Sequence, residues 1–131
     1  MAPVTPIIGS GEQQIQPIWL DDVAAYFAAG VDKPEAANRT FELGGPDAVT
    51  WNEFWRRLKR ELGQLRPSVH VPVGLMRLNA LVTERLPGNI PLTRDLLTML
   101  EHGDNVVSND DAVRTFKLPL VPLDEQLRRA V

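Results

Sequence analysis

The 131-residue chain is long enough to bury one hydrophobic core without metals or disulfides. Its hydrophobic fraction of 44% and charged fraction of 24% are typical of a globular domain. A net charge of −3 disfavours nucleic acid and anionic membranes as partners, and the absence of cysteine excludes disulfides, thiolate nucleophiles and cysteine metal sites. With no signal-peptide pattern and no apolar run of roughly 20 residues, we expect a soluble, cytoplasmic protein without a membrane span.

The first predicted elements are short, and polar residues lie between them. Residues 1–14 are rich in proline and glycine and are predicted to form an extended leading segment. Residues 15–20 have the pattern of a short strand. Asp21 or Asp22 then supplies a carboxylate to cap a helix that Gly30 is expected to end.

The clearest helix in the sequence follows a second predicted strand at residues 39–43. Thr50 and Glu53 have the spacing of a capping box, in which the threonine oxygen accepts from the amide of residue 53 and the glutamate reaches back. Apolar residues recur at helical spacing from Trp51 onward, and Gly63 is expected to end the helix.

The second half of the chain shows the same kinds of signal. They predict a strand at 69–71, a broadly apolar helix at 73–86, a helix from Thr93 to about His102, a short strand or extended piece at 106–107, a helix at 110–116, and a last helix opened by Pro122. The sequence therefore predicts one α+β domain over residues 1–131, with about five helices and three or four short strands.

Few side chains have the pattern of a chemical site. His70 is expected on a solvent-facing strand edge and His102 in the last turn of a helix. No serine has the glycine-flanked turn of a hydrolase nucleophile. The oxygen-rich stretch 104–111 lacks the central glycine and closing glutamate of a calcium loop. We therefore expect no catalytic residue, no metal site and no cofactor-binding residue in this chain.

Two stretches point to a known family. Residues 16–24 (QPIWLDDVA) and 39–46 (RTFELGGP), followed by the Thr50 cap, resemble the C-terminal portion of extended or atypical short-chain dehydrogenase/reductases. The likeness is strongest to proteins similar to the Rossmann-like accessory subunit of respiratory complex I. Further segments fit the family in order and extend the resemblance over essentially the whole chain: 7–11, 91–95, 104–107 and 122–125.

The resemblance implies that half of an architecture is missing. In the family a preceding Rossmann half supplies the glycine-rich nucleotide loop and a Tyr-x-x-x-Lys active site. The single tyrosine here, Tyr26, has Gly30 four residues later, where a lysine would be required. The resemblance thus implies a C-terminal part lacking the dinucleotide-binding half, with Met1 inside the parent sequence. NAD or NADP is implied for the full-length family, and no cofactor for this chain.

The resemblance also bears on the substrate. Nucleotide-sugar epimerases commonly carry a diphosphate-binding arginine where this chain has Ile15, and a histidine where it has Trp19, so nucleotide sugars are disfavoured. We expect Gln16, Trp19 and Arg94 to line part of a small-molecule cleft that faces the missing half.

Two other hypotheses remain open. In the first, the chain is a non-catalytic interaction module whose apolar helices dock onto an N-terminal Rossmann domain or a second copy. In the second, the chain is a free-standing carrier of a small ligand, which no feature of the sequence supports. In every case the isolated chain is expected not to catalyse.

Overall fold

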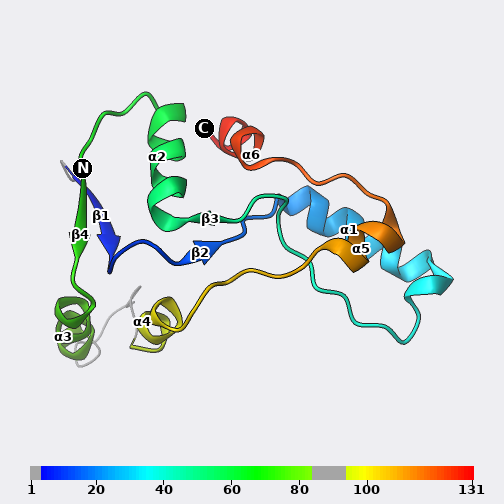
Figure 1. Cartoon of the computed structure of the whole chain (residues 1–131), viewed down its shortest axis with the longest axis horizontal. Helices are drawn as coiled ribbons and strands as arrows, with labels where there is room; N and C mark the ends of the chain where they lie inside the picture. The colour runs from blue at the N-terminus through cyan, green and yellow to red at the C-terminus, as the bar shows by residue number, and fades with distance from the viewer. Residues whose placement is uncertain (1–3, 84–93) are drawn as a thin grey trace. The chain divides into compact units, whose positions relative to one another are not determined.

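The computed structural model describes residues 4–83 and 94–131, which form an α+β arrangement of short strands and helices (Figure 1). The chain divides into two compact units: unit 1 spans Met1–Gln14 and Thr50–Asp104, and unit 2 spans Ile15–Val49 and Asn105–Val131. The chain passes from one unit to the other three times: within β2 (Gln14–Ile15), within β3 (Val49–Thr50), and between Asp104 and Asn105. Strands β2 and β3 pair with each other. The expectation of a single domain stays a prediction.

Unit 1 is built on a two-stranded parallel sheet. Strand β1 (Thr5–Ile8) pairs with β4 (Ser68–Val71), with Thr5 opposite Ser68 and Ile8 opposite Val71. Its helices are α2 (Trp51–Glu61), α3 (Val73–Thr83) and α4 (Arg94–Glu101), of which α3 and α4 pack against each other. Its buried apolar residues include Ile7, Ala80 and Leu97.

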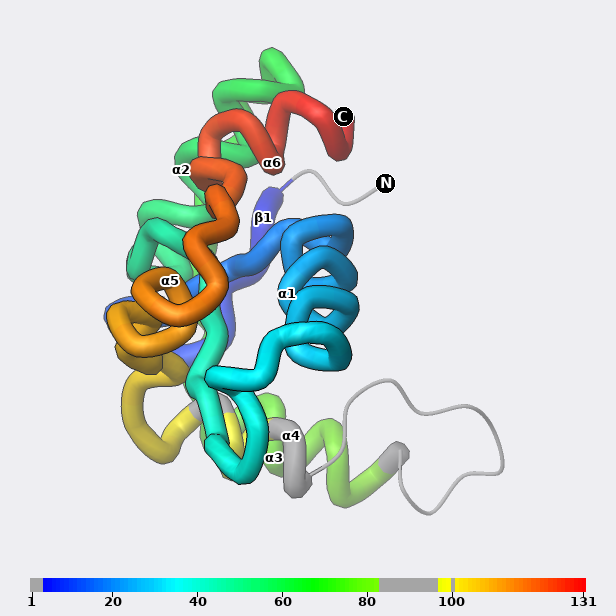
Figure 2. The backbone as a smooth tube through the Cα atoms, turned by 90° about the vertical axis from the view of Figure 1, so that its right-hand side faces the viewer, coloured from blue at the N-terminus to red at the C-terminus, as the bar shows by residue number. Residues whose placement is uncertain are grey.

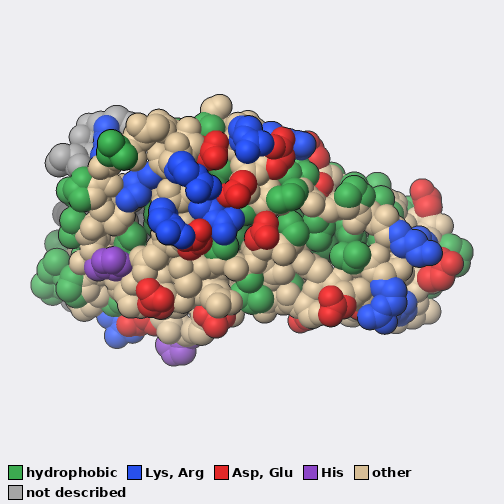
Figure 3. Space-filling model, turned by 45° about the horizontal axis from the view of Figure 1, so that its top comes forward, with side chains coloured by type: hydrophobic (Ala, Val, Ile, Leu, Met, Phe, Trp, Pro, Cys, Tyr) green, Lys and Arg blue, Asp and Glu red, His purple; other side chains and the backbone are tan. Residues whose placement is uncertain are grey.

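The start of α2 confirms half of the predicted capping box. Thr50 Oγ1 accepts a hydrogen bond from the Glu53 amide at 3.1 Å, which satisfies one of the free amides of the first turn. The Glu53 carboxylate does not return to the cap, because it pairs with Arg56 and, at 2.7 Å, with Arg57. The Arg57 hydrogen bond is the main reason that the pKa of Glu53 lies below its usual value. Acidic and basic side chains are intermixed on the surface that Figure 3 shows.

Unit 2 has an aromatic core between two helices. Its elements are α1 (Leu20–Asp32), the 3-10 turn η1 (Pro34–Ala36), α5 (Asp110–Phe116) and α6 (Leu123–Ala130). Tyr26 of α1 and Phe116 of α5 meet edge to face with ring centroids 5.7 Å apart. Phe41 stacks on Phe116 in the same manner at 5.0 Å. Figure 2 shows α1 and α5 in the smooth trace.

The start and end of α1 differ from the sequence prediction. The helix begins at Leu20 after an N-cap at Trp19 that makes no side-chain capping bond, and it continues through Gly30. Asp21 and Asp22 lie in its first turn, where their charge still suits the helix dipole. The Asp22 carboxylate instead accepts from the Val121 amide at 2.7 Å. The predicted aspartate cap is therefore wrong, because a distant backbone amide takes the carboxylate.

The predicted strands are the least accurate part. The leading segment contains β1, which the sequence pattern missed, and of the predicted strand 15–20 only residue 15 lies in a strand, β2. Residues 39–43 and 106–107 form no strand among the described residues, although Asn105 makes an isolated parallel bridge with Ile15. A strand needs a partner, and local sequence does not reveal one.

The remaining predicted elements are confirmed where the structure describes them. They are β4, α3 as far as residue 83, α5, and α6 with Pro122 at its N-cap. Helix α4 is also present, while the predicted cap at Thr93 and the end of the 73–86 helix lie outside the described residues. None of the described helices has the length and hydropathy to cross a membrane.

Candidate functional site

Gln16, one of the three predicted cleft residues, bridges two backbone segments of unit 2. Its Nε2 donates to the carbonyl oxygen of Gly45 at 2.8 Å. Its Oε1 accepts from the amide of Val107 at 2.8 Å. Both ends of the side-chain amide therefore form hydrogen bonds inside the unit, and Gln16 links the backbone at Gly45 to the backbone at Val107.

Asn109, at the N-cap of α5, makes a similar pair of side-chain hydrogen bonds to the backbone. Its Oδ1 accepts from the amide of Gly44 at 2.6 Å, and its Nδ2 donates to the same Gly45 carbonyl at 2.8 Å. We call the set Gln16, Gly44, Gly45, Val107 and Asn109 the amide clamp. From the sequence, the stretch that contains Asn109 was interpreted as a turn and a helix cap, and the contacts of Asn109 with Gly44 and Gly45 were not predicted.

The two glycines of the amide clamp are required by close contacts. Both are buried. A Cβ on Gly45 would lie 1.6 Å from the carbonyl oxygen of Pro17, and a Cβ on Gly44 would lie 2.6 Å from the side chain of Gln16. Both distances are far shorter than any van der Waals contact, so the backbones approach this closely because glycine has no side chain.

Trp19, the second predicted cleft residue, lies three residues further along unit 2 and is half-buried. Its Nε1 donates to Asp21 at 3.2 Å, and the guanidinium of Arg129 lies 5.9 Å from the centre of its ring. Arg129 in turn pairs with Glu125 at 2.9 Å, and this hydrogen bond is the main cause of the lowered pKa of Glu125. Trp19 therefore offers an apolar ring beside a charged pair.

Tyr26 has the environment of a core residue. Its hydroxyl donates to the Leu118 carbonyl at 2.7 Å, and only 3% of the residue is exposed. Burial, and secondarily the nearby Asp22 carboxylate, raise the pKa of Tyr26 above its usual value. A tyrosine held protonated in this way is a poor general base, in keeping with the missing lysine partner.

Arg94, the third predicted cleft residue, is the first residue of α4 and belongs to unit 1. Its side chain lies outside the described part of the structure. The structure thus brings Gln16 and Trp19 into one unit and assigns Arg94 to the other. Whether the three residues share a cleft stays a prediction.

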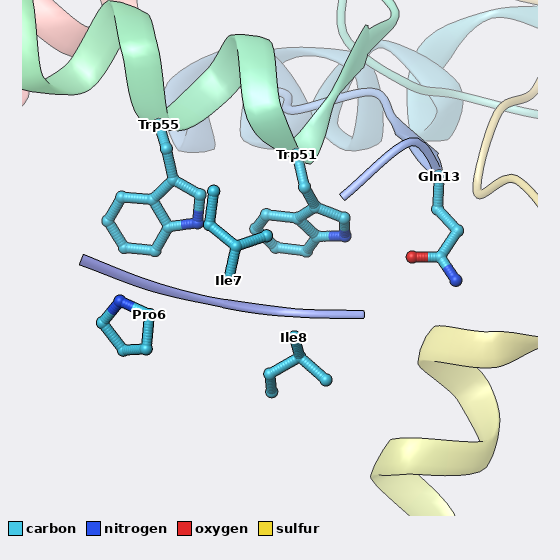
Figure 4. Close-up of a pocket in the computed structure, with 6 residues that line it drawn as sticks. All are labelled: Pro6, Ile7, Ile8, Gln13, Trp51 and Trp55. Carbon is cyan, nitrogen blue, oxygen red and sulfur yellow. The ribbon is translucent and has the colours of Figure 1, made fainter. Parts of the chain in front are cut away.

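Unit 1 contains an apolar hollow of about 190 Å³ that the sequence did not predict. Pro6, Ile7 and Ile8 of β1 form one wall, and the rings of Trp51 and Trp55 form the other, with the Gln13 amide at one end (Figure 4). We call this space the tryptophan hollow. The sequence assigned both tryptophans to the packing face of a helix; the signal was two large rings one helical turn apart.

The amide clamp and the tryptophan hollow offer side-chain amides and apolar surface. The residues that line the tryptophan hollow carry one side-chain amide and no ionisable group. Among the described residues no group of three or more His, Cys, Asp or Glu could hold a metal ion. The arrangement can bind an apolar or aromatic group and orient it with one hydrogen bond.

No protein-family model matches the chain. One curated relative is the Arabidopsis thaliana protein "NADH dehydrogenase [ubiquinone] 1 alpha subcomplex subunit 9, mitochondrial". It is 29% identical over 126 residues, which cover 89% of this chain and 31% of the relative. This chain therefore spans about a third of the curated relative that it matches.

Solved structures extend the comparison to the fold. A triphenylmethane reductase from Citrobacter sp. matches 95% of this chain with 44% of its own, at a TM-score of 0.70 and 20% identity. A UDP-glucuronic acid 4-epimerase from Bacillus cereus, solved with NAD, matches 94% of this chain with 31% of its own, at a TM-score of 0.63 and 13% identity. The chain thus has the fold of the C-terminal region of Rossmann-like reductase and epimerase chains.

Proposed function

We propose that this chain is the substrate-side C-terminal part of an NAD(P)-dependent reductase-like or epimerase-like protein and that it catalyses nothing by itself. One observation carries the proposal. The fold accounts for 95% of this chain but for 44% of the Citrobacter reductase, so more than half of that protein lies outside the match. We propose that the unmatched part contains the dinucleotide-binding half of such an enzyme.

The polar side chains of the chain support the proposal that it does not catalyse a reaction by itself. The amides of Gln16 and Asn109 hold backbone segments together, and Tyr26 is protonated and hydrogen-bonded to a carbonyl. None of them is poised to move a proton or attack a substrate. The nicotinamide cofactor and the proton-transfer residues would come from the other half. The Citrobacter and Bacillus proteins were solved with NADP(H) and NAD, respectively.

The tryptophan hollow is our candidate for the substrate contact. A cavity of about 150 Å³ accommodates benzene, so the observed 190 Å³ suffices for one ring or a branched aliphatic group. The Citrobacter relative acts on triphenylmethane dyes, which consist of such rings. Gln16, Trp19 and Arg94 remain proposed cleft residues, and the two whose side chains are described, Gln16 and Trp19, are both half-buried.

A second function is favoured by the sequence relative. Its name makes it a subunit of a respiratory NADH dehydrogenase, which is consistent with an interaction module that supports an assembly without catalysis. We propose the cytoplasm for this chain, although its Arabidopsis relative is mitochondrial by name. The two functions differ in one respect: the reductase-like part places a substrate at the tryptophan hollow, and the module does not.

The proposal is tested by adding back the missing half. The part of the Arabidopsis relative that the match leaves uncovered, produced separately, is mixed with the intact 131-residue chain and followed by sedimentation velocity. We expect a one-to-one complex with a Kd in the micromolar range or tighter. If the two proteins sediment independently at concentrations of about 0.1 mM, the chain is not the complement of such a half.

A further inference from the structure

The Gln13 side chain is the polar feature of the tryptophan hollow. It is half-buried and lies at one end of the hollow, whose other lining side chains are aliphatic or aromatic (Figure 4). Among the residues that the structure describes, the Gln13 side-chain amide makes no hydrogen bond. A partly buried amide without a protein partner favours a ligand that supplies a hydrogen bond at this end.

The backbone around Gln13 is fixed by the first turn of α2. The Gln13 carbonyl accepts from the amide of Trp51 at 3.2 Å, and the Gly11 carbonyl accepts from the amide of Asn52 at 3.0 Å. Gly11 is buried, and a Cβ there would overlap Oδ1 of Asn52. The segment before Gln13 therefore lies directly against the start of the helix that carries both tryptophans of the hollow.

The Asn52 side chain adds three hydrogen bonds at the same place. Its Nδ2 donates to the Ser10 carbonyl at 3.0 Å and to Oε1 of Glu12 at 2.7 Å. Both hydrogens of the amide are thus used, and Oδ1 can only accept, which it does from Nε2 of His70 at 2.9 Å. His70 Nε2 therefore carries a proton. One side chain links the segment before Gln13 to strand β4.

His70 supports Asn52 from the strand next to the hollow. The parallel pairing of β1 and β4 places His70 opposite Ile7, which lines the hollow. The exposed imidazole then holds the oxygen of the Asn52 amide, while the nitrogen of the same amide holds the segment before Gln13. A side-chain amide with all of its hydrogen-bonding groups in use is fixed in one orientation.

Glu12 sets the charge near the Gln13 end of the hollow. Its carboxylate belongs to the residue before Gln13 and is held by Asn52, the residue after Trp51. The residues that line the hollow include no cation. A ligand carboxylate at Gln13 would therefore meet a negative charge without a counter-charge, beside apolar walls that weaken solvent screening. The hollow consequently favours a neutral ligand.

We propose that the tryptophan hollow takes a neutral aromatic ring with one hydrogen-bonding group, and that Asn52, held by His70, is the positioning residue that keeps Gln13 in place for that group. This inference rests on the proposed function, in which the hollow contacts a ligand. Asn52 and His70 touch no ligand themselves. They fix the backbone that carries Gln13, so less conformational entropy is lost when the ligand binds.

Phenol and toluene are matched probes for this inference, because they are equal in size and differ by a hydroxyl in place of a methyl group. The chain has three tryptophans and therefore three indole N–H signals in a proton–nitrogen NMR spectrum. The signals of Trp51 and Trp55 should shift with either probe. Trp19 belongs to unit 2 and is the internal control, identified with Trp19→Phe. We expect Kd values in the millimolar range for ligands of this size.

Variants separate positioning from packing. Gln13→Leu removes the hydrogen bond, so phenol should bind at least about fivefold more weakly, whereas toluene should bind at least as well as in the parent. Asn52→Leu should weaken phenol at least about threefold and leave toluene within about twofold. His70→Leu should act in the same direction, and His70→Gln, which keeps an N–H donor for Asn52, should bind phenol like the parent.

The pattern across both probes decides the outcome. If Asn52→Leu weakened phenol and toluene equally, Asn52 would be a packing residue and the positioning role would be overturned. Benzoate should bind the parent at least about tenfold more weakly than phenol, and equal affinity would overturn the preference for a neutral ligand. Unshifted Trp51 and Trp55 signals at about 5 mM of either probe would overturn the hollow as a ligand site. The sedimentation experiment judges the proposed function separately, because it requires no ligand.

Discussion

Gln16 Nε2 donates to the Gly45 carbonyl at 2.8 Å, and through the other end of the same amide Gln16 accepts from Val107. This makes Gln16 a structural residue in addition to a predicted cleft residue. Gln16→Ala would leave the Val107 amide without its acceptor, and we expect a loss of about 1 to 3 kcal/mol in the free energy of unfolding.

Urea unfolding measures that loss, with Gln14→Ala as the control because the Gln14 side chain is exposed. A Gln16→Ala chain as stable as its parent would contradict the structural role.

Gly45 permits no side chain. Gly45→Ala would place a methyl carbon 1.6 Å from the Pro17 carbonyl oxygen, so the amide clamp would have to open. We expect a loss of at least about 3 kcal/mol, at the upper end of the range for single substitutions. The comparison is Gly74→Ala inside α3, where nothing lies within 4 Å and alanine should stabilise the helix by about 0.5 to 1 kcal/mol. Equal melting temperatures for the two variants would contradict the packing described here.

Local sequence patterns predicted most of the helices correctly, whereas most of the strands were predicted poorly. The Thr50 cap and the Gly63 stop are interactions within one turn, and the structure shows both. The strand β1 forms through pairing with β4, more than 60 residues away. Nothing near Thr5–Ile8 in the sequence signals that partner, which is why the segment read as merely extended.

The same reason explains what was missed at the candidate site. Asn109, Asp47 and the tryptophan hollow depend on contacts between segments that are distant in the sequence, and local patterns do not reveal those partners. The family resemblance did predict the fold, because the order of several weak motifs is specific even where each motif is not. It could not tell that the Gln16 amide is engaged by the backbone on both sides.

Asp47 caps a helix that lies 76 residues later in the sequence. Its Oδ2 accepts from the amide of Leu123 at 2.8 Å, and Pro122 at the N-cap of α6 contributes no side-chain bond. We expect Asp47→Ala to lower the free energy of unfolding by about 0.5 to 2 kcal/mol. Asp47→Asn keeps an acceptor oxygen and should lose less. If alanine and asparagine had equal effects in urea unfolding, the hydrogen bond to Leu123 would not be the cause.

Tyr26 makes the stability of the folded chain depend on pH in the alkaline range. Its pKa is raised in the folded state, so above about pH 10 the folded chain retains a proton that the unfolded chain loses. The stability that Tyr26 contributes is therefore complete below pH 10 and declines as pH rises. Tyr26→Phe should cost about 1 kcal/mol at neutral pH, through the lost bond to Leu118, and the difference from the parent should narrow above pH 10. Melting temperatures between pH 7 and 11 would show a constant difference if the hydroxyl were not linked to folding.

The central claim is that this chain supplies the substrate side of an enzyme-like fold and depends on another half for its nucleotide. Isothermal titration with NADH and NADPH measures this directly, first on the 131-residue chain and then on its complex with the part of the Arabidopsis relative that the match leaves uncovered. We predict no binding to the chain alone at nucleotide concentrations up to about 1 mM, and binding to the complex with a Kd in the micromolar range. Micromolar binding to the chain alone would contradict the account.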